Sequence, residues 1–145
     1  MNLNVLLNKL KANGYKTTEQ RKVILQVLVS NDQNLISVET ILSKSKEMNP
    51  KTNMSTVYRN LEILEKLDLL YKVIAENGMT LYKLACSDKH HHHLICKGCG
   101  KTEVIDFCPL KSLIQLSKEK NFNLTEHKLE LYGYCKDCEY NKKQP

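Results

Sequence analysis

Two Cys-x-x-Cys pairs in the second half of the chain constrain its fold more than any other feature. Each pair presents two sulfurs to one point, and four thiolates at about 2.3 Å satisfy a tetrahedral zinc ion. Positions 100–134 separate the two pairs, so a whole folded segment must bring the second pair back to the first. The spacing predicts one closed structural zinc site that contributes to folding, rather than four buried cysteines without a ligand. Its ligands are Cys96, Cys99, Cys135 and Cys138.

Cysteine and histidine are confined to the second part of the chain. All six cysteines and all five histidines of the 145 residues lie at or after position 86, which predicts two modules, 1–85 and 86–145. The first residues do not resemble a secretion signal, and no apolar run reaches the ~18–20 residues of a membrane span. We therefore expect a cytoplasmic protein without a membrane partner, in which metal explains the cysteines better than disulfides do. The net charge of +6 permits nucleic-acid binding without requiring it.

The first module has the pattern of a winged helix-turn-helix. Apolar residues recur at helical spacing in four segments, and the first of these segments ends at Gly14. A period of two then replaces the helical period in residues 71–74 and 81–84, which flank Asn77-Gly78, a strong hairpin signal. We therefore expect an α+β protein, with an N-terminal winged helix followed by a small α/β domain. The expected N-caps of the later helices are Thr17 (in a capping box with Gln20), Ser37 and Ser55.

The fourth predicted helix, residues 56–67, has the features of a DNA-recognition helix. Its apolar stripe begins at Val57 and leaves the rest of the first turn exposed. There Arg59 can pair with guanine, while Tyr58 offers a hydroxyl or a ring to thymine methyl groups and phosphate. The same residues also fit an ordinary solvated face of a helical bundle. The expected contacts to double-stranded DNA are Ser55, Thr56, Tyr58, Arg59, Lys16 and Arg21, with Lys51 and Lys83 as further phosphate contacts.

A run of four histidines precedes the first cysteine pair. The apolar residues that follow continue this run as a strand, in which alternate side chains point to opposite faces. His91 and His93 then face one side, and His90 and His92 face the other, so the run can supply two separate metal sites. Cys86 is positioned to join His91 and His93. A thiolate with imidazoles suits zinc, histidines with carboxylates suit iron or manganese equally, and the alternative is a solvated loop that binds metals loosely.

Three more residues of the second module are candidates. His127 lies on the apolar face of an alternating segment, residues 124–134, and is either a hydrogen-bonded core residue or a metal ligand. Asp106 lies in a predicted apolar strand, where a metal ion would be an economical partner because a buried carboxylate is costly unless it is paired. Cys108 stands just before a helix that starts at Pro109, and we interpret it as structural, with oxidant sensing as the alternative.

A zinc enzyme and a metal buffer are the competing classes of protein. Nucleotide deaminases activate a zinc-bound water with a glutamate close to the zinc-binding histidine. No glutamate adjoins this histidine run, and no proline precedes Cys96 or Cys135, so we expect that the protein is not an enzyme. A buffer or metal chaperone would have no use for a recognition helix.

Motifs in both modules carry a family resemblance: Gly14-Tyr15-Lys16-Thr17 with Arg21, STVYRNL at 55–61, His90 to Cys99 with Gly100-Lys101, and His127 ahead of LYGYC at 131–135. Through these motifs the chain resembles the ferric uptake regulator (Fur) superfamily over about residues 6–138. The resemblance implies a winged helix joined to an α/β dimerisation domain. It also implies a homodimeric repressor that binds palindromic operators when a regulatory metal is loaded, with Tyr58 and Arg59 on the DNA.

Within the superfamily the chain looks most like the zinc uptake regulator (Zur) branch. Iron and peroxide sensors carry a metal-binding histidine just before the third helix, where this chain has Asn34-Leu35-Ile36-Ser37. Zur-type sequences place a cysteine ten residues before the first zinc knuckle, and Cys86 stands there. The resemblance therefore implies a regulatory Zn²⁺ on Cys86, His91 and His93, with a ferrous-iron or peroxide sensor holding Fe²⁺ or Mn²⁺ as the alternative. No small-molecule substrate other than a metal ion is expected.

Two acidic ligands of the family pattern have no direct equivalent. The regulatory site usually takes an acid near the start of the wing, where this chain has Leu70-Tyr71-Lys72; Asp68, Glu76 or water are the substitutes. A third site is implied by the resemblance, but its usual acid is absent from residues 110–117. We group Asp106 with the histidines of this third site, which are His90, His92 and His127.

Overall fold

A computed structural model describes residues 2–85 and 91–142 of the chain. The chain divides into two compact units, Met1–Asp88 and Lys89–Pro145, which are described separately below. Within the described residues, no helix is both long enough and apolar enough to cross a membrane.

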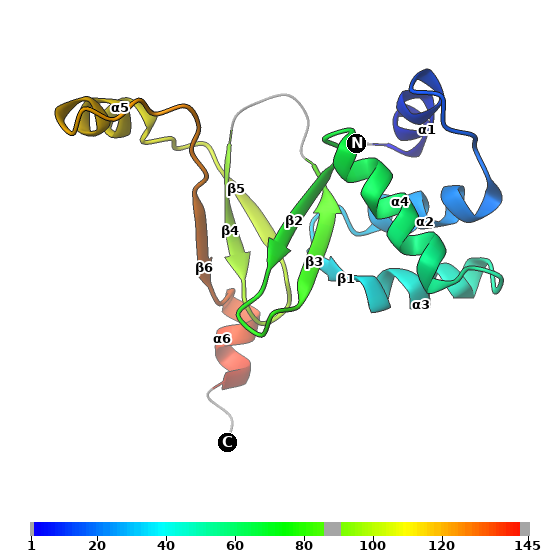
Figure 1. Ribbon diagram of the computed structural model, residues 1–145. Coiled ribbons are helices and arrows are strands. Elements are labelled where there is room, and N and C mark those ends of the chain that lie inside the picture. Colours follow the sequence, from blue (N-terminus) through cyan, green and yellow to red (C-terminus); the bar gives the residue numbers. More distant parts are fainter. Residues whose placement is uncertain (1, 86–90, 143–145) are drawn as a thin grey trace. The chain divides into compact units, whose positions relative to one another are not determined.

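The first unit is a winged helix (Figure 1), as the hydrophobic pattern predicts. Four helices are combined with a three-stranded antiparallel sheet in the order β1-β3-β2, whose first strand lies between α2 and α3 in the chain. Asn77-Gly78 lies in the turn between β2 and β3, where Gly78 has a φ of +79°, a value that glycine tolerates best. The elements are α1 (Leu3–Ala12), α2 (Glu19–Ser30), β1 (Ile36–Ser37), α3 (Val38–Met48), α4 (Met54–Lys66), β2 (Leu70–Ile74) and β3 (Thr80–Leu84).

Leucine, isoleucine and valine from all four helices fill the core of this unit. Each fully buried side chain of this kind contributes about 1.5–3 kcal/mol to folding. The stripe of α4 packs into this core, and Tyr58, on the flank of the helix, remains 46% exposed. Packing against the core therefore fixes the position of the helix that carries the predicted DNA contacts. The innermost residues are Leu6, Leu10, Ile24, Leu25, Leu28, Ile41, Val57, Leu61 and Leu64.

Two of the three predicted N-caps are wrong by one or two residues. Thr18, not Thr17, caps α2, with its side chain accepting from the N–H of Arg21. Asn53, not Ser55, caps α4, since Asn53 Oδ1 accepts from the N–H of Thr56 at 2.9 Å. The third cap, Ser37, is confirmed. The errors arise because adjacent Thr, Ser and Asn residues satisfy the same capping chemistry, and the register of the turn decides among them.

The second unit contains a three-stranded sheet with the order β5-β4-β6. The central strand β4 runs antiparallel to β5 and parallel to β6 (Figure 1). One end of the sheet therefore holds the start of β4, the end of β5 and the start of β6, and the other end holds their opposite termini. The elements are β4 (His92–Cys96), β5 (Thr102–Ile105), α5 (Leu110–Glu119), β6 (Glu130–Gly133) and α6 (Lys136–Lys142).

Candidate metal centres and nucleic-acid interface

Four cysteine sulfurs converge at the end of the sheet where β4 and β6 finish. Cys96 ends β4, and Cys135 follows β6 and directly precedes α6. The four donor atoms of Cys96, Cys99, Cys135 and Cys138 all lie within 4.8 Å of one another. A tetrahedron with Zn–S bonds of about 2.3 Å has S···S edges of about 3.8 Å. Sγ of Cys99 and Sγ of Cys135 lie 3.8 Å apart, so this pair already has the spacing that a zinc ion requires.

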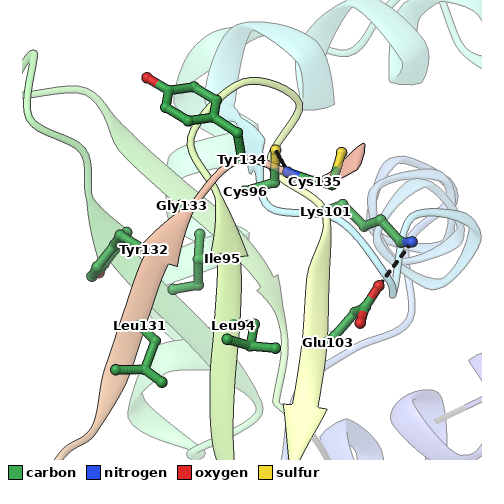
Figure 2. Close-up of a pocket in the computed structure, with 10 residues that line it drawn as sticks. All are labelled: Leu94, Ile95, Cys96, Lys101, Glu103, Leu131, Tyr132, Gly133, Tyr134 and Cys135. Atoms are coloured by element: carbon green, nitrogen blue, oxygen red, sulfur yellow. Dashed lines mark hydrogen bonds and ion pairs between the residues drawn. The ribbon is translucent and has the colours of Figure 1, made fainter. Parts of the chain in front are cut away.

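Backbone contacts hold the two knuckles together at this end. The N–H of Cys135 donates to Cys96 Sγ at 3.3 Å (Figure 2), and the N–H of Lys97 donates to the carbonyl of Gly133 at 2.7 Å. Gly98 completes the fit, because a Cβ at this position would lie 2.8 Å from Cys138 Sγ and 2.9 Å from Cys138 Cβ. Glycine is required here for the close approach of the second knuckle.

The thiols of this cluster do not ionise alike. Burial opposes ionisation of the Cys96 thiol, but N–H groups donated by Cys135, Cys99 and Gly98 outweigh that effect and lower its pKa to about 6. The pKa of Cys138 is raised to about 12, chiefly because its thiol hydrogen-bonds to Cys135, Cys96 and Cys99. Cys96 therefore ionises before Cys138, and a divalent cation is needed before Cys138 ionises near neutral pH.

A second cluster lies at the opposite end of the same sheet. Its donor atoms belong to His92, Cys108 and His127, and all lie within 4.8 Å of one another. Nε2 of His127 is 3.2 Å from Cys108 Sγ and 3.3 Å from Nε2 of His92. His92 is only 3% exposed, so the cluster reaches into the interior of the unit. A partly buried group of two imidazoles and a thiol can hold a borderline metal ion.

The structure places the other predicted ligands as follows. The rings of His91 and His93 lie edge to face with centroids 4.8 Å apart. Cys86 and His90 lie outside the described residues. Asp106 is exposed and lies outside the second cluster, so its predicted burial is wrong: β5 ends at Ile105, and Asp106 lies in the irregular segment that follows.

The sequence pattern singled out Cys108 but did not place it with His92 and His127. It lies in the irregular segment between β5 and α5, where no periodicity assigns a direction to its side chain. The pairing of His92 with Ile105 brings this segment next to the start of β4. Only the strand register, which the sequence did not provide, could have connected Cys108 with His92.

An apolar pocket of about 200 Å³ lies beside the four-cysteine cluster (Figure 2). Leu94 and its neighbour Leu131 line it, and both remain more than 40% exposed. An ion pair between Lys101 Nζ and Glu103 Oε1, at 2.9 Å, borders the pocket. Apolar side chains on this face of the sheet are therefore exposed to solvent at the pocket.

The first turn of α4 presents the predicted DNA contacts to solvent. Tyr58, Arg59 and Ser55 are exposed, and Thr56 is partly exposed. Lys16 and Lys51 are exposed as well. Lys83, in contrast, is only 4% exposed, so its prediction as a phosphate contact is wrong. It lies in β3, in the middle of the hairpin pairing and opposite Tyr71, where the strand turns it inward.

Arg21 is engaged within the protein rather than extended toward solvent. Its Nε donates to Asn60 Oδ1 at 2.7 Å, and its Nη1 donates to the carbonyl oxygen of Lys16. Asn60 is 5% exposed and donates in turn to the Thr56 carbonyl at 2.8 Å. The guanidinium also lies 5.8 Å from the ring of Tyr15. These contacts connect α2 to the first turn of α4, which gives Arg21 a positioning role beside the exposed residues.

Comparison with known proteins finds the same architecture. The sequence profile of the ferric uptake regulator family matches residues 12–132. A ferric uptake regulation protein of Staphylococcus epidermidis is 39% identical over 141 residues, covering 97% of this chain and 99% of the relative. The Staphylococcus aureus protein of the same name is 38% identical over 139 residues, covering 96% of this chain and 99% of the relative.

Solved structures agree with this assignment. The Helicobacter pylori ferric uptake regulator Fur, whose structure is described as having three functional metal binding sites, matches with a TM-score of 0.73 and 26% identity, over 96% of this chain and 95% of that chain. A zinc-bound manganese uptake regulator matches with a TM-score of 0.68 and 28% identity, over 93% of this chain and 99% of that chain. These relatives share one fold and differ in the metal for which they are named.

Proposed function

The chain belongs to the ferric uptake regulator family, and from that premise we propose that it is a zinc-sensing repressor that binds palindromic operator DNA as a homodimer. Members of the family are metal-responsive transcriptional regulators, so the chain is a regulator and not an enzyme. The proposal adds three points to that assignment: the sensed metal, the mode of DNA binding and the second copy of the chain.

The paired rings of His91 and His93 carry the zinc proposal. Their centroids lie 4.8 Å apart, and the two residues stand on either side of His92, the first residue of β4, so the two imidazoles can serve one ion. Cys86 is the thiolate proposed to join them, and it precedes the pair by five residues. Two imidazoles and one thiolate match the preference of zinc, whereas Fe²⁺ and Mn²⁺ favour carboxylates in place of sulfur.

Uncovered apolar surface supports the homodimer. Helix α5 has no buried residue, and its Leu116 is 54% exposed. On the sheet, Leu94 and Leu131 are 42% and 46% exposed. Because monomeric proteins rarely leave contiguous apolar patches uncovered, a partner surface is expected here. A second copy of the chain supplies a surface of the same apolar character, and two copies match the two-fold symmetry of a palindrome.

The exposed turn of α4 supports major-groove binding. Arg59 can donate two hydrogen bonds to guanine, and Tyr58 can contact thymine methyl groups or phosphate. Arg21 fixes Asn60 behind this turn, so the exposed side chains start from a rigid helix. Lys16 and Lys51 are the remaining exposed basic residues proposed to contact phosphate.

A linkage argument connects the two functions. Cys86 follows the wing, whereas His91 and His93 belong to the second unit, so a shared ion would favour one relative orientation of the two units. If that orientation spaces two recognition helices for successive half-sites, metal and DNA strengthen each other's binding by the same factor, about 5- to 150-fold for a coupling of about 1–3 kcal/mol.

A ferrous-iron or peroxide sensor is the second candidate. The names of the Staphylococcus relatives, at 38–39% identity, favour it. The absence of a histidine from residues 34–37 of the sequence, where iron sensors carry one, argues against it.

The test is a DNA-binding titration under anaerobic conditions, with free Zn²⁺, Fe²⁺ and Mn²⁺ each held by a metal buffer. The DNA is selected from a random double-stranded pool in the presence of each metal in turn. We expect zinc to tighten binding at the lowest free concentration. Tightening by Fe²⁺ at concentrations where Zn²⁺ has no effect beyond the four-cysteine site would replace the zinc proposal with the iron one.

Variants separate the sensing ligands from the DNA contacts. In Cys86→Ser combined with His91→Ala, we expect the zinc response to disappear while weak zinc-independent binding remains. Arg59→Ala is the matched control, which lowers DNA affinity at every zinc concentration without moving the zinc midpoint. Persistence of the normal zinc response in the double variant would show that the regulatory ion lies elsewhere.

A further inference from the structure

Three segments that are distant in the sequence meet at the end of the sheet opposite the four cysteines. His92 starts β4, Cys108 follows the end of β5 by three residues, and His127 precedes the start of β6 by three residues. Their donor atoms lie within 4.8 Å of one another, although 16 to 35 positions separate them in the chain. The strand topology alone brings these three ends together, so the arrangement belongs to the fold and not to a single flexible loop.

Hydrogen bonds among the three side chains, which we call the trio, account for only part of the short distances between their donor atoms. Nε2 of His127 lies 3.2 Å from Cys108 Sγ and 3.3 Å from Nε2 of His92. A ring nitrogen has one in-plane direction, which carries either a proton or a lone pair. It can therefore make one linear hydrogen bond, yet two donor atoms lie at bonding distance from this nitrogen. A cation at the centre of the trio would use that lone pair and both neighbouring donors at once.

The distances agree with a zinc-sized centre. Zn–N bonds of about 2.0–2.1 Å give a tetrahedral N···N edge of about 3.3–3.4 Å, and a mixed N···S edge of about 3.6 Å. The observed N···N distance is 3.3 Å, and the observed N···S distance of 3.2 Å is shorter by a few tenths of an ångström. A small outward movement of the thiol completes the geometry.

We propose that Cys108 takes the place of the missing acid in the third site, and that its thiolate, together with His92 and His127, makes this site selective for zinc over Fe²⁺ and Mn²⁺. The sequence pattern grouped the two histidines with an acid, which would have made a site equally suited to iron and manganese. The exposed Asp106 does not occupy that position, and the sulfur of Cys108 does. The selectivity of this site therefore depends on one residue, independently of the metal sensed through Cys86, His91 and His93.

Cobalt spectroscopy tests the proposal directly, because a thiolate bound to Co²⁺ gives an intense sulfur-to-metal charge-transfer band. The full-length Cys86→Ser variant is loaded with one zinc in the four-cysteine site and then titrated with Co²⁺. Zinc retention is checked with a chromophoric chelator, so that a new band cannot come from exchange at that site. With Cys86 replaced, Cys108 is the one cysteine outside the four-cysteine site, and we expect the band to appear with one Co²⁺ bound.

Two further variants show which residues produce the band. Adding Cys108→Ser should abolish it, and adding His127→Gln should weaken Co²⁺ binding at this site by at least about 100-fold, the upper end of the range for partners that only orient a ligand. Retention of one zinc in the four-cysteine site shows that each variant is folded. No band in the Cys86→Ser protein, or the same band after Cys108→Ser, would refute the proposal.

Selectivity is measured by metal competition. In Cys108→Asp, the preference for Zn²⁺ over Mn²⁺ at this site should fall by at least about tenfold, because an oxygen ligand replaces sulfur. An unchanged preference would remove Cys108 as the specificity-determining ligand. Both experiments measure metal binding without DNA, so their failure can be distinguished from failure of the proposed repressor function.

Discussion

Replacing Gly98 with alanine tests whether close approach of the two knuckles sets zinc affinity. The added Cβ would lie 2.8 Å from Cys138 Sγ, and ordinary contact begins at about 3.4 Å, so the sulfur must move by about 0.6 Å. A metal site tolerates deviations of about 0.2 Å in ligand distance. Overpacking of this kind costs about 1–3 kcal/mol, so we expect zinc affinity to fall by about 5- to 150-fold.

The assay is competition for zinc with a chromophoric chelator, together with thermal unfolding followed by circular dichroism. Gly133→Ala is the matched control, because a Cβ there meets nothing within 4 Å although Gly133 lies at the same end of the sheet. The melting temperature of Gly98→Ala should be lower than that of the parent with zinc bound and equal to it after zinc removal, when Cys138 is free to rotate away. Equal zinc affinities for Gly98→Ala and the parent, or an equal loss in Gly133→Ala, would refute the steric argument.

Two other predictions concern the remaining contacts. Arg21→Ala should lower the free energy of unfolding by about 1.5–3 kcal/mol, because it removes a charged hydrogen bond to the buried Asn60. Urea unfolding measures this loss. As a control, substitution of the exposed Arg59 by alanine should change the free energy of unfolding by less than about 0.5 kcal/mol. If both substitutions cost the same, Arg21 has no positioning role. Zinc affinity of the four-cysteine site should decrease as the pH falls, because Cys138, with its pKa raised to about 12, must release a proton before it can bind zinc. Calorimetry of zinc binding in buffers of different ionisation enthalpy should detect this proton. A binding enthalpy that is the same in every buffer would contradict the prediction.

Sequence alone predicts the features that depend on local spacing. The four cysteine sulfurs lie within 4.8 Å of one another, as the two motifs predict, and the buried stripe of α4 begins at Val57 as its period requires. Strand β1 was missed because its two residues are too short to show alternation. The position of Cys108 beside His92 and His127 was not predicted for a different reason: it depends on which strand end lies next to Cys108, which is a property of the sheet register.

The same register connects the two ends of the second unit. Strands β4 and β6 pair in parallel from His93↔Glu130 to Cys96↔Gly133, so the side chains of both strands alternate in step along the whole ladder. The N–H of Cys135 donates to Cys96 Sγ at the end of this ladder. A slip of one residue would shift β6 by about 3.3 Å and reverse its faces. His127, which lies just before β6, would then lose its contact with His92.

The four-cysteine site therefore has a consequence beyond local stability. By fixing where β4 and β6 end, it also fixes where they begin, about 13 Å away along the four residue steps of β4. The hydrophobic core of this unit is small, since Ile95 and Cys96 are its buried apolar residues in the described part of the chain. Such a small core is a weak constraint on strand alignment, so we expect a zinc ion bound by the four cysteines at one end to help keep His92, Cys108 and His127 assembled at the other.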